Sequence, residues 1–304
     1  DRFDRNRDNN QPRREDNRPQ GDRPNFNNGE KKPFNKEFNR DNRDNRDNRP
    51  QGDRQGFNNG EKTLIILCEE GLDFRFETAE DIAKRQRNES LILVSEYAGK
   101  FFQESLKTQE GQTIGYQYFR SRGLEDETIR KYGLGWAPLS RRALSESARA
   151  AGYKEEFLIE TGLSIKYDDG RLVDRFFDRV IFPIHSVSGR VIAFGGRTLK
   201  TDKSVAKYVN SPETEIYVKS KSLYGIYFAK SEISRQDKCI LVEGYLDVLS
   251  MHQLGIRNVV ASSGTSLTVD QIRLIRKFTN NITIIYDGDG AGIKAALRGI
   301  GLVL

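Results

Sequence analysis

The sequence predicts a disordered N-terminal tail, then an α+β subdomain, then an α/β domain built on a parallel sheet. Three features support this division. Residues 1–62 contain no aliphatic side chain, residues 63–235 begin with helical periodicity and become β-rich, and strands alternate with helices over residues 236–304. Continuous Val, Ile and Leu strands between amphipathic helices are typical of a parallel sheet covered on both faces.

The tail has no residues from which a core can form. Its only apolar side chains are scattered phenylalanines, and the first aliphatic residue is Leu64. The stretch Arg18–Lys31 returns almost unchanged as Arg49–Lys62, and Asp-Asn-Arg triplets fill residues 41–49. Burial of so few apolar groups cannot offset the entropy of ordering the chain, so we expect disorder. The alternative is an Arg/Asn-rich arm that binds nucleic acid without sequence preference.

Helical periodicity opens the α+β subdomain. In residues 77–106, apolar side chains recur at mostly helical spacing after Thr78, a favourable N-cap residue. Residues 114–138 predict two short helices separated at Gly123. Residues 145–174 predict a helix pair followed by a turn at residues 168–170.

The second half of this subdomain changes to β-structure. Residues 178–199 contain two β-rich runs around a Ser-Gly turn, which predicts a hairpin. Residues 207–225 predict a loop. After Gln236 we expect strands over residues 238–244, 257–264 and 281–290, each followed by a helix.

Polar and acidic residues follow each strand of the predicted parallel sheet. Glu243 follows the first strand, a Ser-Ser-Gly-Thr run at 262–265 follows the second, and Asp287 and Asp289 follow the third. In such sheets the binding site lies beyond the carboxyl ends of the strands, so these residues are expected to meet. Hard oxygen ligands without histidine or thiolate suit Mg²⁺ or Mn²⁺. An Asp-Gly-Asp-Gly run alone would be an ordinary turn.

Cations and aromatic residues precede this predicted site. Arg179, Arg197, Lys207 and Lys219 are interleaved with Tyr208, Tyr217 and Asn210. We interpret them as a groove that holds phosphates of a single strand or a nucleotide, with a solvated basic face as the alternative. Asp247 lies one helical turn after Glu243, where it could orient Lys207 or Lys219 or cap the helix.

Composition limits the remaining possibilities. The net charge of +6 and the pI of about 9.1 suggest a polyanionic partner. The cysteines and histidines lie far apart and form no CxxC or CxxH pair, so spacing predicts no zinc site. The sequence shows neither an apolar run of transmembrane length nor a signal peptide, and we expect a cytoplasmic protein without a membrane partner.

The motifs together resemble the bacterial DnaG-type DNA primase. Five occur in the family's order within residues 78–304: DRVIFPIHSVSGRVIAFGGRTL, KYVNSPETEIYVKSKSLYG, LVEGYLDV, ASSGTSLT and IIYDGDGAG. The last three belong to the TOPRIM module that primases share with some topoisomerases and nucleases. The resemblance therefore implies a primase-core subdomain over residues 63–235 and a TOPRIM domain over residues 236–304.

This resemblance implies synthesis of short RNA primers on a single-stranded DNA template by metal-dependent nucleotidyl transfer. The family pattern assigns metal binding to Glu243, Asp287 and Asp289, with Asp247 in the same catalytic cluster. Template- or nucleotide-binding positions are matched by Arg179, Arg197, Lys207, Tyr208, Asn210 and Lys219. The implied partners are ribonucleoside triphosphates, the DNA template and the replicative helicase at the replication fork in the nucleoid.

The sequence departs from the family pattern in several places. The Arg/Asn tract stands where the family has a zinc-binding domain, and Gly290 stands where the family has Arg or Lys. The sequence ends at Leu304, before a further acidic motif of the Asp-Pro-Asp kind and before the helicase-binding domain. We therefore expect an incomplete TOPRIM domain without the family's zinc site.

Three functions remain open from the sequence. The first is a primase core, and the second is another TOPRIM enzyme, a topoisomerase or nuclease. The third is a non-catalytic module that binds single-stranded DNA.

Overall fold

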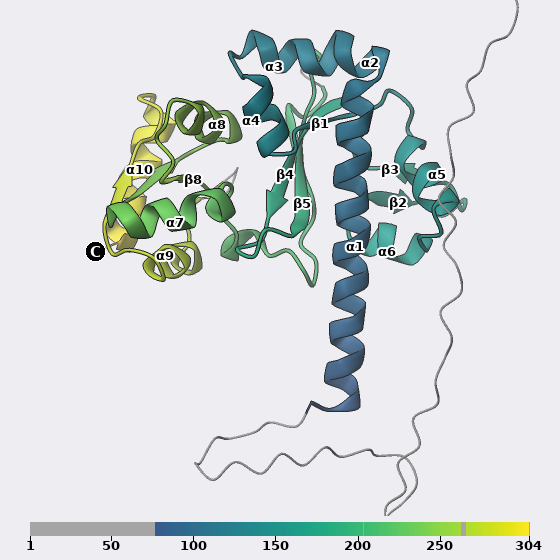
Figure 1. Ribbon diagram of the computed structural model, residues 1–304, viewed down its shortest axis with the longest axis horizontal. Helices are drawn as coiled ribbons and strands as arrows, with labels where there is room; N and C mark the ends of the chain where they lie inside the picture. Colours follow the sequence, from purple (N-terminus) through teal and green to yellow (C-terminus); the bar gives the residue numbers. More distant parts are fainter. Residues whose placement is uncertain (1–76, 203, 263–265, 304) are drawn as a thin grey trace, which may run out of the picture. The chain divides into compact units, whose positions relative to one another are not determined.

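The structure, a computed structural model, describes residues 77–202, 204–262 and 266–303. These residues belong to one compact unit (Figure 1). The predicted disordered tail at 1–62 lies outside the described residues. None of the helices in the described ranges combines the length and apolar character needed to cross a bilayer.

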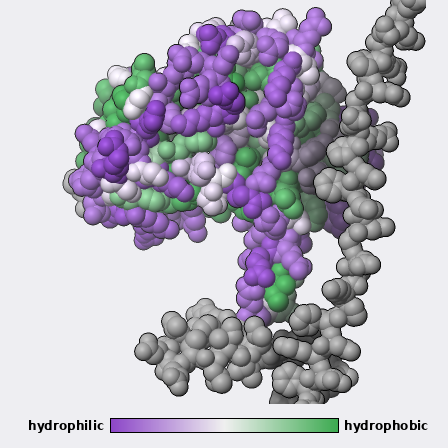
Figure 2. Space-filling view, in the orientation of Figure 1, coloured by the Kyte–Doolittle hydropathy of each residue, from purple (hydrophilic) through white to green (hydrophobic). Residues whose placement is uncertain are grey.

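Helix α1 (Ala79–Lys107) confirms the predicted helix and its cap. Thr78 and Asp81 form a capping box in which each side chain bonds to the other residue's backbone N–H. The first turns are exposed and mostly hydrophilic (Figure 2), whereas Val94, Ala98 and Phe102 are fully buried. The helix is therefore anchored by its second half.

Short elements follow α1. They are α2 (Gln109–Gly111), a π-helix (Gln112–Tyr116), α3 (Gln117–Ser121), α4 (Asp126–Lys131), α5 (Ala143–Ala150) and α6 (Glu155–Glu160). Gly123 separates α3 from α4 with a φ of +76°, as predicted. The predicted turn at 168–170 joins strands β2 (Ser164–Lys166) and β3 (Leu172–Asp174), which the sequence did not reveal.

An antiparallel sheet forms the centre of the α+β part, in the order β1-β4-β5-β6. Strands β4 (Arg179–His185) and β5 (Val191–Arg197) are the predicted hairpin. Strands β1 (Gly135–Ala137) and β6 (Tyr208–Asn210) pair with its two edges. The expectation of a loop at 208–210 was wrong, because hydrogen bonds to β5 convert this short run into an edge strand.

The predicted parallel sheet is present, in the order β8-β7-β9. Its strands are β7 (Cys239–Val242), β8 (Val259–Ala261) and β9 (Ile282–Ile284), followed by α8 (Tyr245–Gln253), α9 (Val269–Arg276) and α10 (Gly290–Val303). Helix α7 (Ile226–Gln236) was not predicted. It packs with α9 on one face of the sheet, and α8 covers the other.

The two parts share a continuous core. Residues of β4 alternate: Ile181 packs toward α1, whereas Phe182 packs toward α8. The Phe182 ring stacks on Tyr245, with ring centres 5.1 Å apart and planes inclined by 10°. A Cβ on Gly195 would lie 2.6 Å from the Tyr245 ring, so the absence of a side chain permits this contact. The carboxyl edge of the parallel sheet is thereby held against β5.

Gly195→Ala should lower the free energy of unfolding by about 1–3 kcal/mol, because the new methyl group displaces the Tyr245 ring. Urea denaturation measures this change. Gly301→Ala is the control, because a Cβ there meets nothing within 4 Å. Equal stability of the two variants would contradict the close packing.

The pH dependence of stability should reflect two buried histidines. Burial lowers the pKa of His185 from 6.5 to about 4, and burial together with Lys131 and Arg257 does the same for His252. Between these values the unfolded chain binds protons that the folded chain does not, so stability falls as pH drops from 6.5 to 4. In urea denaturation across this window, His185→Gln should show a smaller loss than the parent chain. An identical pH dependence would contradict the assignment.

Candidate functional site

The predicted site residues lie at the carboxyl edge of the parallel sheet. Strand β7 pairs in parallel with both β8 and β9, so the residues that follow these strands emerge at one edge. Glu243 follows β7 directly, Ser262 follows β8 directly, and Asp287 lies three residues beyond β9. This confirms that the sheet gathers residues far apart in the sequence.

Glu243 and Asp287 meet through the backbone. The N–H of Asp287 donates to Oε1 of Glu243 at 3.2 Å. Gly292 lies against this contact, because a Cβ there would come within 2.1 Å of the Asp287 carbonyl and 3.0 Å of Glu243 Oε1. Only glycine therefore allows the first turn of α10 to approach the two acidic residues so closely.

Asp289 and Asp247 act as helix caps. Oδ1 of Asp289 accepts from the N–H groups of Ala291 at 3.0 Å and Gly292 at 2.7 Å, at the start of α10. Oδ2 of Asp247 accepts from the N–H of Gly244 at 2.9 Å, at the start of α8. Of the alternatives for Asp247, the structure bears out the helix cap. Each carboxylate is stabilised at the positive end of a helix dipole.

A pocket of about 290 Å³ brings the acidic residues together with strand β6. Glu243, Asp247 and Asp287 line one side, and Tyr208 and Asn210 line the other. Tyr245 connects the two sides, because its hydroxyl donates to Oδ1 of Asn210 at 2.9 Å. The pocket therefore brings together the acidic residues and the β6 residues, which are separate motifs in the sequence.

The donors of this pocket fit a hard cation in chemical type. They are carboxylate, amide and phenol oxygens, the ligand class preferred by Mg²⁺ and Mn²⁺. Within the described ranges, however, no three His, Cys, Asp or Glu side chains already stand close enough to hold a metal ion. The acidic residues line one pocket without forming a closed cluster.

Arg197 is fixed by aromatic rings. Its guanidinium carbon lies 4.7 Å from the ring centre of Tyr118 and 5.7 Å from that of Tyr208. Arg122 lies over the same Tyr118 ring at 5.4 Å. Burial raises the pKa of Tyr208, and the charges of Arg197 and Arg122 oppose that rise. Both arginines therefore lie near Tyr208, which lines the pocket.

Tyr118 and Arg122 were not predicted as site residues. They come from α3 and its C-terminal cap, about eighty residues before Arg197. Interleaved aromatic and basic residues at 116–122 are the signal that could have drawn attention to them. Nothing in the sequence indicates that residues 116–122 lie against β5.

The other predicted cations differ in accessibility. Arg179 is buried, and its Nη1 donates to the carbonyls of Gly196 at 3.4 Å, Ala206 at 3.0 Å and Lys207 at 3.4 Å. Lys207 is exposed and forms no ion pair within the described part of the chain. Lys219 does not line the pocket, and its carbonyl accepts from Gln271 of α9 at 3.1 Å. Arg179 thus holds the backbone that presents Lys207.

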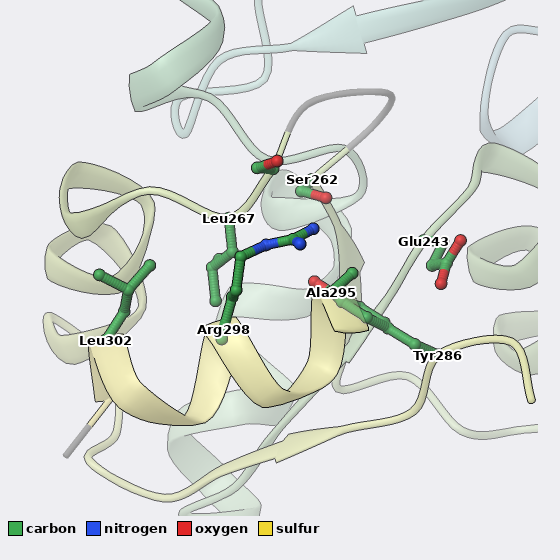
Figure 3. A pocket seen from close by; sticks show the side chains of 9 residues that line it. Glu243, Ser262, Leu267, Tyr286, Ala295, Arg298 and Leu302 are labelled. Atoms are coloured by element: carbon green, nitrogen blue, oxygen red, sulfur yellow. The ribbon is translucent and has the colours of Figure 1, made fainter. Parts of the chain in front are cut away.

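A second cavity of about 350 Å³ borders Glu243 on the side of α10 (Figure 3). Figure 3 shows the Arg298 side chain extending from α10 toward Ser262. Leu267, Tyr286 and Leu302 contribute apolar surface to the same cavity. Arg298 therefore contributes a cation to the cavity that Glu243 also lines.

Two protein-family models match the chain. Residues 101–230 match the N-terminal domain of the DNA primase catalytic core, and residues 240–303 match a Toprim-like domain. Toprim domains generally depend on a metal ion.

Curated relatives include the DNA primase of Clostridium acetobutylicum, 42% identical over 220 residues, which cover 72% of this chain and 36% of the relative. The DNA primase of Escherichia coli strain K12 is 40% identical over 217 residues, or 71% of this chain and 37% of the relative. The chain thus spans just over a third of the length of these relatives.

Solved structures agree with these matches. A DnaG primase catalytic domain bound to single-stranded DNA is 39% identical, with a TM-score of 0.66 over 72% of this chain and 70% of that chain. The RNA polymerase domain of Mycobacterium tuberculosis DnaG primase is 34% identical, with a TM-score of 0.65 over 69% of this chain and 70% of that chain.

Proposed function

This chain belongs to the family of bacterial DnaG-type DNA primases, and we propose that it makes short RNA primers on single-stranded DNA. In this reaction the 3′-hydroxyl oxygen of one ribonucleotide attacks the α-phosphorus of the next triphosphate. The new P–O bond replaces the bond to the β-phosphate, pyrophosphate leaves, and the hydroxyl proton passes to solvent. The proposed partners are a DNA template, ribonucleoside triphosphates and the replicative helicase at the fork in the cytoplasm.

One observation carries this proposal. The same pocket joins acidic residues of the Toprim-like part, Glu243 and Asp287, to Tyr208 and Asn210 of the primase-specific part. Arg197 lies over the Tyr208 ring at its border. A triphosphate needs charge neutralisation along its phosphates and an oriented nucleophile, and this arrangement offers both.

We assign metal binding to Glu243, Asp287 and Asp289, with Mg²⁺ or Mn²⁺ as the ion. When bound, the ion would neutralise phosphate oxygens and lower the pKa of the attacking hydroxyl. Asp247 holds the first turn of α8 in place beside Glu243 through its bond to Gly244. We therefore give Asp247 a positioning role within the catalytic cluster.

The cations are assigned to phosphate binding. Arg197 is held between two tyrosine rings, and its buried Nε has no hydrogen-bond partner within the described residues. Arg122 and Lys207 are exposed. These three side chains would hold the phosphates of the template or the incoming nucleotide. Lys219 stays a predicted phosphate contact, although it does not line the pocket. Arg179 would act by presenting Lys207.

A second candidate function is binding of single-stranded DNA without catalysis. It is favoured by the spread of the carboxylates in the described ranges and by the capping role of Asp289. A topoisomerase or nuclease is disfavoured, because residues 101–230 match a domain of the primase core.

Asp289→Asn separates the charge of Asp289 from its capping role. Asparagine can accept the same two N–H bonds, so the melting temperature should stay within error of the parent. Incorporation of labelled ribonucleotides on single-stranded DNA with Mg²⁺ or Mn²⁺ should fall about a hundredfold. Asp270→Asn, on α9, is the matched control. Equal incorporation by the parent and Asp289→Asn would refute the metal assignment, and an inactive parent would favour the DNA-binding function.

Lys207→Ala tests phosphate binding apart from catalysis. Its affinity for a single-stranded oligodeoxythymidylate should fall, and the slope of log Kd against log salt should drop by about one unit. Fluorescence anisotropy over a salt series measures both. Lys107→Ala, an exposed lysine of α1 paired with Glu104, should leave the slope unchanged. An unaltered slope in Lys207→Ala would show that Lys207 touches no phosphate.

A further inference from the structure

Helix α8 contacts the primase-specific part at both ends. Its first residue, Tyr245, donates a hydrogen bond to Asn210 of β6, and Glu243 and Gly244 directly precede the helix beside the pocket. Its last residue, Gln253, reaches the turn between α3 and α4, about 130 residues earlier in the sequence. The helix is about 13 Å long at 1.5 Å per residue, so it links the two contacts as a rigid rod.

Gln253 bonds to both sides of that turn. Its Oε1 accepts from the N–H of Glu125 at 2.8 Å, and its Nε2 donates to the carbonyl of Gly123 at 2.9 Å. Glu125 is the N-cap residue of α4 and has no side-chain cap of its own, so the glutamine amide satisfies a backbone group there. The side-chain amide of glutamine can make both bonds because it carries an acceptor oxygen and a donor nitrogen.

Arg122 directly precedes this turn. It is the C-cap residue of α3, and its exposed side chain lies over the Tyr118 ring that Arg197 also contacts. Its charge opposes the rise in the pKa of Tyr208. It forms no ion pair with any residue that the structure describes. Because the turn is bonded to α8, the backbone of Arg122 keeps a fixed position relative to this helix, which begins beside Glu243.

We propose that Gln253 is a positioning residue that holds Arg122 at the phosphate-binding side of the pocket. The inference rests on the proposed function, since it takes phosphate as the ligand of Arg122. His252, next to Gln253, packs edge-on against Tyr132 with ring centres 5.2 Å apart. That contact remains in Gln253 variants, so α8 should stay packed when the amide is removed.

The test is a double-mutant cycle between Gln253→Ala and Arg122→Ala. Binding of two phosphate probes is measured, a single-stranded oligodeoxythymidylate and ATP, so that the responding probe identifies template or nucleotide. With at least one probe, Gln253→Ala should weaken binding about fivefold when it is made in the parent chain. The same substitution made in the Arg122→Ala variant should have almost no effect. Equal effects in both backgrounds, or no effect of Arg122→Ala with either probe, would overturn the proposal.

Two further variants separate positioning from general damage. Gln253→Glu keeps the acceptor for Glu125 N–H but turns a second carboxylate oxygen toward the Gly123 carbonyl, so its binding should fall at least as far as that of Gln253→Ala. Gln236→Ala is the matched control, because Gln236 is likewise the last residue of its helix and bonds only within it, to Glu232. Binding by Gln253→Ala equal to that of Gln236→Ala would also overturn the proposal.

An assay of primer synthesis by the parent chain distinguishes failure of the Gln253 proposal from failure of the proposed function. Coupled binding without synthesis would leave the role of Gln253 standing and remove the proposed polymerase activity. Synthesis without coupling would support the polymerase activity and overturn the role of Gln253.

Discussion

The packing of Tyr245 on Gly195 is the contact on which the candidate site depends. Tyr245 is the first residue of α8, and its ring occupies the space that a side chain at position 195 would fill. The same ring stacks on Phe182, and its hydroxyl bonds to Asn210. One side chain therefore ties strands β4, β5 and β6 to the loop that carries Glu243. Gly195 of the Gly-Gly-Arg motif in β5 allows this packing, and Arg197 lies two residues further along the same strand.

Electrostatics in the pocket is arranged with little direct pairing of opposite charges. Arg197 is held by two aromatic rings, and Arg179 by backbone carbonyls. Asp247 and Asp289 are held by helix N–H groups. Cations and carboxylates near one another would otherwise form ion pairs and neutralise themselves. Fixing each by neutral partners leaves their charges available to a ligand, which under the proposed function would be a triphosphate with its metal ion.

The arrangement also explains why the two parts of the chain share one core. For the proposed primer synthesis, a template, a nucleotide and a metal ion would have to be held in close alignment, and hinged domains would lose that alignment. Here α8 begins at the acidic edge of the parallel sheet and ends at the α3–α4 turn. Aromatic contacts fill the space between, including Tyr132 with His252 and Tyr224 with Tyr245.

The sequence by itself determined the α1 helix and its Thr78 cap, the β4–β5 hairpin, the parallel sheet, and the placement of Glu243 and Asp287 at one edge. These features follow from local periodicity and from the rule that parallel strands end together, which need no knowledge of distant contacts. Tertiary structure alone decided that β1 and β6 are strands, because three-residue runs carry too little periodicity and depend on the partner strand. It also decided that Tyr118 and Arg122 join Arg197, that Arg179 turns inward, and that Gln253 reaches Gly123. Those contacts join segments far apart in the chain, and packing of rings and backbone in three dimensions is what brings them together.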